Sequence, residues 1–326
     1  MRDLLALPKA HLHLHLEGGM RPSTLEERAE HYGIPVPVVS GFGSFAAFSS
    51  MYVAACDVLR TDDDLIRLVD EVVDDAAFSG AVWIEPAIYA PHHLERLGPV
   101  EHVIEVTLDA LASAARRTGV GAGLMVAADR TVDPADAIAQ ARVAVRYADR
   151  GVVSFGLAND EARWPPEPFA EAFAIAREAG LLSTPHAGEL DGPASVIGAL
   201  DALHADRIQH GVRSIEDPEL VKRLADEGIC LDVCPSSNVL LSVVPSIEDH
   251  PLPALLAAGV RCSLNADDPL LFGPGLLEEY ELCRTVLDLD DEQLAAVARA
   301  SIEASGASDD LQATAVAGVA AWLDIR

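Results

Sequence analysis

Basic residues are scarce in this chain. Its 326 residues include 23 Lys and Arg against 52 Asp and Glu, which gives a formal net charge of −29. A field of this sign repels phosphate backbones and anionic lipids, so we expect neither nucleic acid nor membrane as a partner. The chain also lacks any apolar run approaching about 20 residues, and its N-terminal segment is too short for a signal peptide's apolar region. We therefore expect a cytoplasmic globular protein, of an oligomeric state that the composition leaves open.

Cysteine is also sparse. The five cysteines lie in apolar segments without close pairs, which favours buried reduced thiols over a disulfide framework. Cys230 and Cys234 fall on one predicted strand, at an even offset that places both side chains on the same side. No other soft ligand lies near them in sequence, so a metal site built on this pair is the weaker interpretation.

The most unusual stretch runs from His11 to Gly18 and reads HLHLHLEG. Its alternation has the two-residue period of a strand, with three histidines on one face and three leucines on the other. Clustered imidazoles repel when protonated and need partners when buried. A divalent metal satisfies them, since histidines at i and i+2 can both reach one Zn²⁺ at about 2.0–2.1 Å. Hydrogen-bonded core histidines are the alternative that this stretch alone leaves open.

Half of the residues are hydrophobic, in alternating strand and helix patterns. After the first strand, β-branched runs predict strands at residues 81–88, 121–127, 152–157, 182–186, 207–210, 229–234 and 261–265. Amphipathic segments between them predict helices, among them 100–118, 134–150, 168–180, 192–204 and 218–228. Eight strands alternating with helices predict a parallel (β/α)8 TIM barrel. No linker interrupts the series, so we expect residues 1–326 to form a single domain with a helical tail from residue 290.

Two helical segments are predicted between the first and second strands. Ser23 is expected to cap a helix that runs to Tyr32 and ends at Gly33. Residues 41–60 then carry an apolar stripe at spacings of three and four, formed by Phe42, Phe45, Phe48, Met51 and Tyr52. Core packing explains such a stripe. The alternative is a helical lid over the metal site, with Phe45 and Phe48 against a flat substrate ring.

Polar residues gather at the predicted strand ends, where barrels of this kind place their chemistry. The first strand supplies His13 and His15, and later ends supply His186, His210, and the pair Asp267-Asp268. In a closed barrel the first and eighth strands are neighbours, so Asp267 lies beside His13 and His15, with His186 reaching across. A zinc ion held by three imidazoles and one carboxylate keeps one coordination position for a water molecule, and such an open position is typical of catalytic zinc sites. Singly, His186 could be a hydrogen-bonded barrel histidine and Asp267-Asp268 a turn before Pro269, but the joint arrangement argues against coincidence.

Four of these segments together resemble the adenosine deaminase family of the amidohydrolase superfamily. They are residues 7–18 (LPKAHLHLHLEG), 184–189 (TPHAGE), 209–211 (QHG) and 263–269 (SLNADDP), whose order and spacing cover nearly the whole chain. The resemblance implies one zinc ion, with His13, His15, His186 and Asp267 as ligands. It also implies Glu189 as the proton shuttle, His210 and Asp268 beside the zinc-bound water, and Asp268 on the purine N7.

These roles suit the deamination of a 6-aminopurine. Zinc lowers the pKa of its water to about 7, and the resulting hydroxide can attack C6. Protonation of N1 makes C6 electrophilic, so a carboxylic acid such as Glu189 must face N1. His210 would stabilise the negative charge that develops on the attacking oxygen.

Several positions depart from the family pattern. Glu17 stands where adenosine-specific members carry an Asp that contacts the ribose, and Asn159 replaces a Gly whose backbone amide meets purine N3. The predicted second strand keeps Glu85 but lacks the Arg expected two residues later, and His11 stands where Glu is usual. We therefore expect Glu17 and Asn159 to contact the substrate and to influence which purine is accepted. Glu17 would accept from a ribose hydroxyl of a nucleoside or, if the substrate is free adenine, from the N–H of the ring.

The sequence thus predicts a zinc-dependent hydrolase that takes a small-molecule purine. Adenosine or 2′-deoxyadenosine is the first expectation. Adenine, or a modified adenosine such as aminodeoxyfutalosine, is the alternative within the class. A hydrolase of other amides or phosphoesters would need a second metal, for which no carboxylated-lysine candidate stands at a strand end. A catalytically inactive binding module is disfavoured by the complete set of ligands and by Glu189.

Overall fold

Short parallel strands form the centre of the structure, a computed structural model that describes residues 1–325. One run of pairing joins β1, β2, β4, β5 and β6, with β3 also on β2, and a second joins β7, β8, β9 and β10. The strands are β1 (Lys9–His15), β2 (Ala81–Ile88), β3 (Gly121–Ala122), β4 (Leu124–Asp129), β5 (Val152–Ala158), β6 (Leu182–Ser183), β7 (His186–Ala187), β8 (Arg207–His210), β9 (Cys230–Val233) and β10 (Arg261–Leu264).

The two runs close into a barrel. At one junction Thr184 N–H donates to Phe155 O and Gln209 N–H donates to Pro185 O. At the other, His15 N–H donates to Asp267 O and Asp267 N–H donates to His13 O, each at 3.1 Å. Asn265 adds a side-chain link there, because its Oδ1 accepts from the backbone N–H groups of Leu12 (2.7 Å) and His13 (3.1 Å). The eight-position ring predicted from the sequence is confirmed.

Two predicted strands are interrupted. The segment predicted at 121–127 is divided at Gly123 into β3 and β4, and the one predicted at 182–186 is divided into β6 and β7. Pro185 has no N–H to give to a ladder, which accounts for the second interruption. Each pair still occupies one position of the ring, so the architecture is unchanged.

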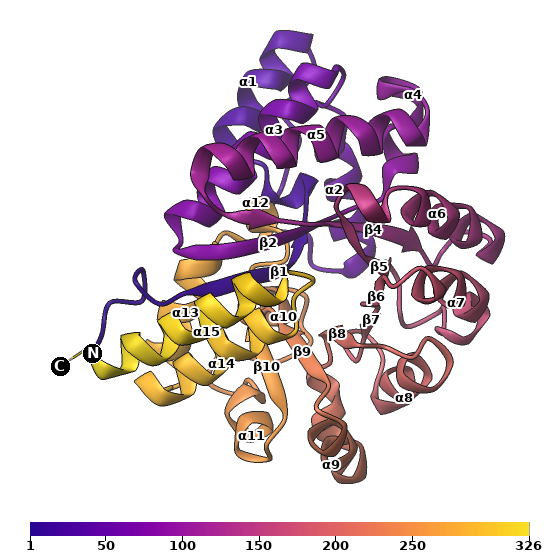
Figure 1. Ribbon diagram of the computed structural model, residues 1–326. Helices are drawn as coiled ribbons and strands as arrows, with labels where there is room; N and C mark the ends of the chain where they lie inside the picture. The colour runs from indigo at the N-terminus through magenta and orange to yellow at the C-terminus, as the bar shows by residue number, and fades with distance from the viewer. Residues whose placement is uncertain (326) are drawn as a thin grey trace.

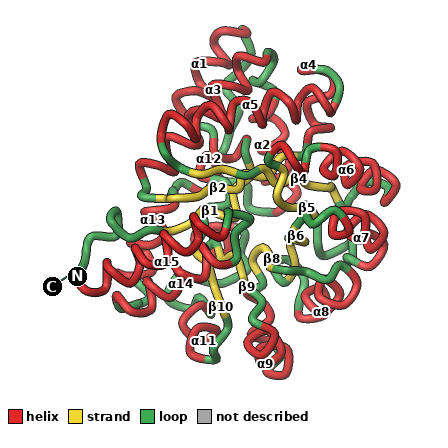
Figure 2. Tube along the Cα trace, viewed as in Figure 1, coloured by secondary structure: helices red, strands yellow, loops and turns green. Residues whose placement is uncertain are grey.

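Helices surround the barrel, as Figures 1 and 2 show. The longer ones are α1 (Pro22–Tyr32), α2 (Phe45–Cys56), α3 (Asp62–Phe78), α5 (Val100–Thr118), α6 (Pro134–Arg146), α7 (Ala170–Glu178), α8 (Pro193–Ala202), α9 (Pro218–Glu227), α13 (Leu276–Thr285), α14 (Asp291–Glu303) and α15 (Asp309–Asp324). The short ones are α4 (Leu94–Leu97), α10 (Pro235–Leu240), α11 (Leu252–Ala257) and α12 (Pro269–Phe272). Within residues 1–325, no helix is both long enough and apolar enough to cross a bilayer.

One helix start differs from the prediction. Helix α1 begins at Pro22 with Arg21 at the N-cap, and no side chain caps it, so Ser23 is not the cap. Proline suits the first helical position because its φ is fixed and its missing N–H would be unpaired there. The predicted end is confirmed, since Gly33 follows Tyr32 with φ 63°. Helix α2 occupies the predicted insertion, and α14 and α15 form the predicted tail.

The interior of the barrel below the site is ionic. Arg207, fully buried, donates to Asp232 Oδ2 (2.7 Å) and Glu85 Oε2 (2.5 Å), and Trp83 Nε1 also donates to Glu85 (2.8 Å). Arg207 on β8 thus pairs with Glu85 on β2 through a buried ion pair. A buried pair of this kind needs all its partners, because a lone charge there is costly.

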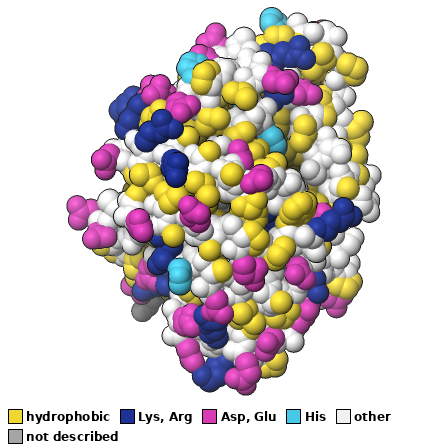
Figure 3. Space-filling view, turned by 90° about the vertical axis from the view of Figure 1, so that its right-hand side faces the viewer, with side chains coloured by type: hydrophobic (Ala, Val, Ile, Leu, Met, Phe, Trp, Pro, Cys, Tyr) yellow, Lys and Arg dark blue, Asp and Glu magenta, His cyan; other side chains and the backbone are white. Residues whose placement is uncertain are grey.

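The outer surface mixes charges of both signs. The face in Figure 3 shows acidic and basic side chains scattered among hydrophobic ones. Many of the arginines pair with acids, such as Arg21 with Asp75 and Arg117 with Asp70. The excess of acid therefore remains as a net negative surface.

Candidate active site

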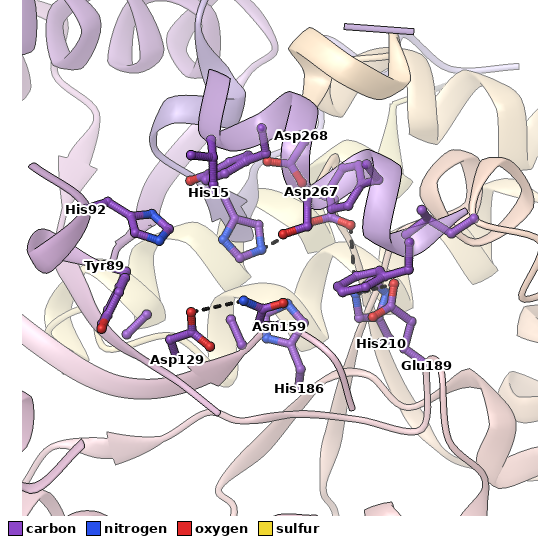
Figure 4. A pocket seen from close by; sticks show the side chains of 18 of the residues that line it. His15, Tyr89, His92, Asp129, Asn159, His186, Glu189, His210, Asp267 and Asp268 are labelled. Atoms are coloured by element: carbon purple, nitrogen blue, oxygen red, sulfur yellow. Dashed lines mark hydrogen bonds and ion pairs between the residues drawn. The ribbon is translucent and has the colours of Figure 1, made fainter. Parts of the chain in front are cut away.

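A cavity opens at the C-terminal ends of the strands, where the prediction places the chemistry. It encloses about 790 Å³, including its open mouth. The residues named by the prediction that line it are His15, Phe45, Phe48, Asn159, His186, Glu189, His210, Asp267 and Asp268. Figure 4 shows most of them converging from different strand ends.

His13 and His186 face each other across the barrel axis. The Nδ1 of His13 lies 3.0 Å from Asp232 O, and the Nδ1 of His186 lies 3.1 Å from Leu157 O. A carbonyl accepts only, so each Nδ1 carries the proton and each Nε2 presents a lone pair. The two Nε2 atoms lie 3.2 Å apart. Two lone pairs this close repel unless a cation lies between or beside them.

Asp267 completes this cluster. Its Oδ1 lies 3.4 Å from His13 Nε2 and 3.3 Å from His15 Nε2, and Ser237 Oγ donates to its Oδ2 at 2.6 Å. Burial opposes ionisation of this carboxyl, but its interactions with the imidazoles of His13 and His15 outweigh burial and hold its pKa well below the usual value. Burial, and then the closeness of the imidazoles of His13 and His15, lowers the pKa of His186 well below its usual value. Neutral imidazoles and an ionised carboxylate are the forms that bind a divalent ion.

His210 belongs to a different chain of hydrogen bonds. Leu252 N–H donates to His250 Nδ1 (3.1 Å), so His250 donates through Nε2 to Asn238 Oδ1 (3.2 Å). The amide of Asn238 then donates to His210 Nδ1 at 3.1 Å. This order leaves the proton of His210 on Nε2, which lies 3.4 Å from Glu189 Oε1. His210 is therefore a donor into the cavity. The side chains close enough to share one ion form two groups, His13, His186, His210 and Asp267 in one, and His15, Asp267 and Asp268 in the other, so the structure groups His210 rather than His15 with the other predicted ligands.

Glu189 and Asp268 are buried acids. Burial, then the negative charge of Asp267, raises the pKa of Glu189 well above its usual value. The same two causes raise the pKa of Asp268, whose Oδ1 is buried without a hydrogen-bond partner among residues 1–325. A protonated carboxyl can donate to a ring nitrogen. An unpaired buried oxygen in a cavity is a position where a ligand atom would compensate the cost of burial.

Glu161 holds the loop that carries Glu189. Its buried carboxylate accepts from four successive backbone N–H groups, with N···O distances of 2.5 Å at residue 188, 2.9 Å at 189, 2.8 Å at 190 and 3.2 Å at 191. Arg130, also buried, donates to His186 O at the start of this segment. The loop is thus fixed from two sides.

Glu17 differs from the expectation. It is buried, but its carboxylate does not line the cavity; it accepts from Tyr52 Oη (2.7 Å) and contacts His93 Nε2 (2.5 Å). Burial opposes ionisation, but the bonds to His93 and Tyr52 lower the pKa of Glu17 to about 2. Its contacts are therefore internal and tie β1 to helix α2. His11 likewise lies outside the cluster, where its Nε2 accepts from Ala266 N–H (3.2 Å).

Sequence reasoning missed several contributors to the site. Asn238 lies in the segment CPSSN directly after β9, a polar strand end that the same search could have included. Asp129 ends β4 and is likewise a polar strand end. His93 carries no local pattern, because its partner Glu17 lies 76 residues away. The two cysteines remain buried thiols: Cys234 Sγ lies 3.4 Å from His13 Nδ1, away from the converging Nε2 atoms, and burial raises its pKa well above the usual value.

A parallel barrel with histidines and aspartates converging at the C-terminal ends of its strands defines a hydrolase of the amidohydrolase type. The adenosine deaminase family profile matches residues 8–322, and the chain belongs to that family. A Streptomyces virginiae protein, provisionally named an adenosine/adenine deaminase, is 49% identical over 99% of this chain and 98% of its own length.

Solved structures agree with this assignment. The adenine deaminase of Arthrobacter aurescens superposes with a TM-score of 0.91 at 32% identity, covering 98% of this chain and 100% of that one. An amidohydrolase from Burkholderia ambifaria with bound Zn superposes with a TM-score of 0.88 at 29% identity, covering 98% and 92%. The protein is therefore a deaminase-type hydrolase with a possible metal site.

Proposed function

We propose that this protein hydrolytically deaminates a 6-aminopurine, using one zinc ion held by His13, His15, His186 and Asp267. The observation that carries the proposal is the convergence of unprotonated imidazole nitrogens and an ionised carboxylate beside two further acids. The donor set fits a zinc ion, which prefers nitrogen and oxygen ligands of this kind. Such an ion supplies the Lewis acidity that activates water near neutral pH.

Three further side chains transfer a proton to the substrate or form hydrogen bonds with it. Glu189, neutral because of its burial, donates a proton to N1 of the purine and makes C6 electrophilic. His210 presents its Nε2–H to the oxygen that attacks C6 and stabilises the charge developing there. Asp268, protonated because burial and the charge of Asp267 raise its pKa, donates from its carboxyl to N7 of the ring. Phe45 and Phe48 of helix α2 cover the apolar face of the ring, and whether α2 moves as a lid stays a prediction.

Adenine is the first candidate substrate, supported by the similarity to an adenine deaminase. Glu17 does not distinguish the candidates, because a contact to a ribose hydroxyl and a contact to the ring N–H of adenine would both need a carboxylate open to the cavity, whereas Tyr52 and His93 occupy it. Adenosine and 2′-deoxyadenosine stay as the second candidates, supported by the relative named for both substrates.

A screen of ammonia release tests this function. Zinc-loaded enzyme is assayed with adenine, adenosine and 2′-deoxyadenosine, beside a Glu189→Gln variant. We expect turnover of at least one substrate, fastest with adenine, and a kcat at least about 10²-fold lower in the variant because an amide cannot protonate N1. Zinc content and adenine binding should persist in Glu189→Gln. Absence of ammonia from all three substrates would overturn the proposal, and faster turnover of adenosine would restore the nucleoside as substrate.

A further inference from the structure

The cavity wall opposite the predicted metal ligands carries a carboxylate without an assigned role. Asp129 ends β4 and Asn159 directly follows β5. In the ring of eight positions, β5 stands four places from β10, which leads into Asp267, so this wall faces the ligand cluster across the mouth. Figure 4 shows Asp129 beside Asn159, on the opposite side of His15 from Asp267.

Asp129 is held in a fixed orientation. Its Oδ1 accepts from the backbone N–H (2.8 Å) and the hydroxyl (2.7 Å) of Thr131, and its Oδ2 accepts from Asn159 Nδ2 (3.0 Å). Asn159 is itself fixed, with φ 84° and its Oδ1 accepting from Asp160 N–H (2.9 Å). An acceptor prepared in this way loses little freedom when a ligand donates to it.

Asp129 is one of four acids that line the cavity, with Glu189, Asp267 and Asp268, and no Lys or Arg among residues 1–325 lines it. Burial raises the pKa of Glu189 and Asp268, so these two add little negative charge. Arg130 lies next in sequence, but its guanidinium is committed to the carbonyl groups of Trp164 and His186 behind the wall. Asp129 therefore attracts hydrogen-bond donors and repels anions.

We propose that Asp129 is a specificity-determining residue that accepts a hydrogen bond from the N9–H of a free purine base and excludes nucleotides. The inference rests on the proposed function, because it needs C6 at the metal cluster and N1 at Glu189. In that orientation the N3 and N9 edge of the bicyclic ring points to the opposite wall. A nucleoside puts a sugar carbon on N9 and removes the donor, and a nucleotide adds a phosphate near the carboxylate.

The discrimination follows from desolvation. A site built to accept an N–H disfavours the analogue that lacks it, since the remaining acceptor position of the buried carboxylate is then left unfilled. Asp129 is only 8% exposed, so water replaces the missing donor poorly. The effect should appear with 9-methyladenine, which differs from adenine by one methyl group at N9.

The test compares adenine, 9-methyladenine and AMP in wild type and in Asp129→Asn, which removes the charge at nearly constant volume. Asp149→Asn is the matched control, because Asp149 is exposed. We expect wild type to prefer adenine over 9-methyladenine at least tenfold in kcat/KM and to leave AMP unreacted. Asp129→Asn should lower kcat/KM for adenine at least tenfold more than for 9-methyladenine. Equal losses for both ligands would reduce Asp129 to a structural role and overturn the inference.

Calorimetric titration separates this inference from the proposed function. Adenine and 9-methyladenine are titrated into zinc-loaded protein that carries Glu189→Gln, alone or combined with Asp129→Asn or Asp149→Asn, so that adenine is not consumed during the measurement. Weaker adenine binding with Asp129→Asn but not with Asp149→Asn, with the two ligands then bound alike, supports the role of Asp129 even if no ammonia is released. Unchanged adenine affinity in Asp129→Asn overturns it even if the enzyme deaminates adenine.

Discussion

The position of a single proton decides what His210 can contribute. Asn238 must turn its amide nitrogen toward His210, and it does so because His250 donates to its oxygen. Without the hydrogen bond from His250, nothing fixes the Asn238 amide in this orientation, and it can rotate by 180° so that its oxygen faces His210. His210 would then carry its proton on Nδ1 and lose its donor role in the cavity.

His250→Phe should therefore lower kcat for deamination at least tenfold with little change in KM or zinc content. His250→Gln, whose side-chain amide can still donate, should recover part of the loss. Long-range ¹H–¹⁵N spectra of the histidine side chains should show the tautomer of His210 switching in His250→Phe and not in His31→Phe, a change at an exposed histidine. An unchanged tautomer and kcat in His250→Phe would contradict this chain of contacts.

Lys9 makes stability depend on pH. Its buried ammonium donates to Leu4 O and Leu7 O, both at 2.9 Å, and burial lowers its pKa to about 8 despite the charge of Asp3. The unfolded chain holds that proton up to a pKa near 10.5. Between these values the unfolded state binds more protons, so the contribution of Lys9 to stability rises with pH.

Comparison with Lys9→Met isolates this contribution. From pH 7.5 to pH 10, the free energy of unfolding of wild type relative to Lys9→Met should rise by about 2 kcal/mol. Urea unfolding of both proteins at the two pH values measures the difference, and other titrating groups cancel between them. A difference that stays constant or falls would show that Lys9 is not desolvated as described.

At the scale of elements, the loop after β7 owes its shape to one carboxylate. Glu161→Ala leaves four backbone N–H groups of residues 188–191 without their acceptor. We expect kcat to fall at least tenfold because Glu189 loses its fixed position. Zinc content should persist, since His186 precedes this loop.

Glu171→Ala, at an exposed helical position, provides the matched control. Zinc analysis and steady-state kinetics distinguish the two outcomes. Loss of zinc together with a lower kcat would show that Glu161 also supports the metal ligands. A normal kcat would show that residues 188–191 keep their conformation without the carboxylate of Glu161. Glu161→Gln, which keeps one acceptor oxygen, should fall between wild type and Glu161→Ala.

Strands and helices whose position depends on residues close in sequence were predictable, whereas contacts between elements far apart in sequence were not. The alternating histidines place β1, and Gly33 ends α1, because periodicity and backbone freedom are local properties. The cap at Ser23 was wrong because Pro22 is pre-shaped for the first helical position. The partners of Glu17, namely Tyr52 and His93, could not be predicted, since each comes from another element that only the closed fold brings near.

At the scale of the molecule, the proposed metal joins elements from both ends of the chain. Its ligands come from β1, β7 and the loop after β10, and without a cation the facing imidazole lone pairs repel. Zinc should therefore stabilise the whole fold, by about 4 kcal/mol when free zinc is a thousandfold above its dissociation constant.

Thermal unfolding of chelator-treated and zinc-loaded protein measures this linkage, with elemental analysis to count about one zinc per chain. The loaded form should have the higher Tm. His186→Ala should lose both the zinc and the zinc-dependent rise in Tm. Equal Tm values for apo and loaded wild type, or unchanged zinc in His186→Ala, would reject the ligand assignment.

The closure of the barrel between β1 and the segment after β10 also determines when the site can form during synthesis. Asn265 accepts a hydrogen bond from the backbone N–H of His13, 252 residues earlier in the chain. The metal ligands of β1 are therefore synthesised long before the residues that complete their site. A nascent chain that stops before β10 has His13, His15 and His186 but lacks Asp267 and the strand that seats β1. Contacts so distant along the chain form late and slowly. Capture of the metal would then coincide with completion of the polypeptide, and truncated products would be inert toward purines.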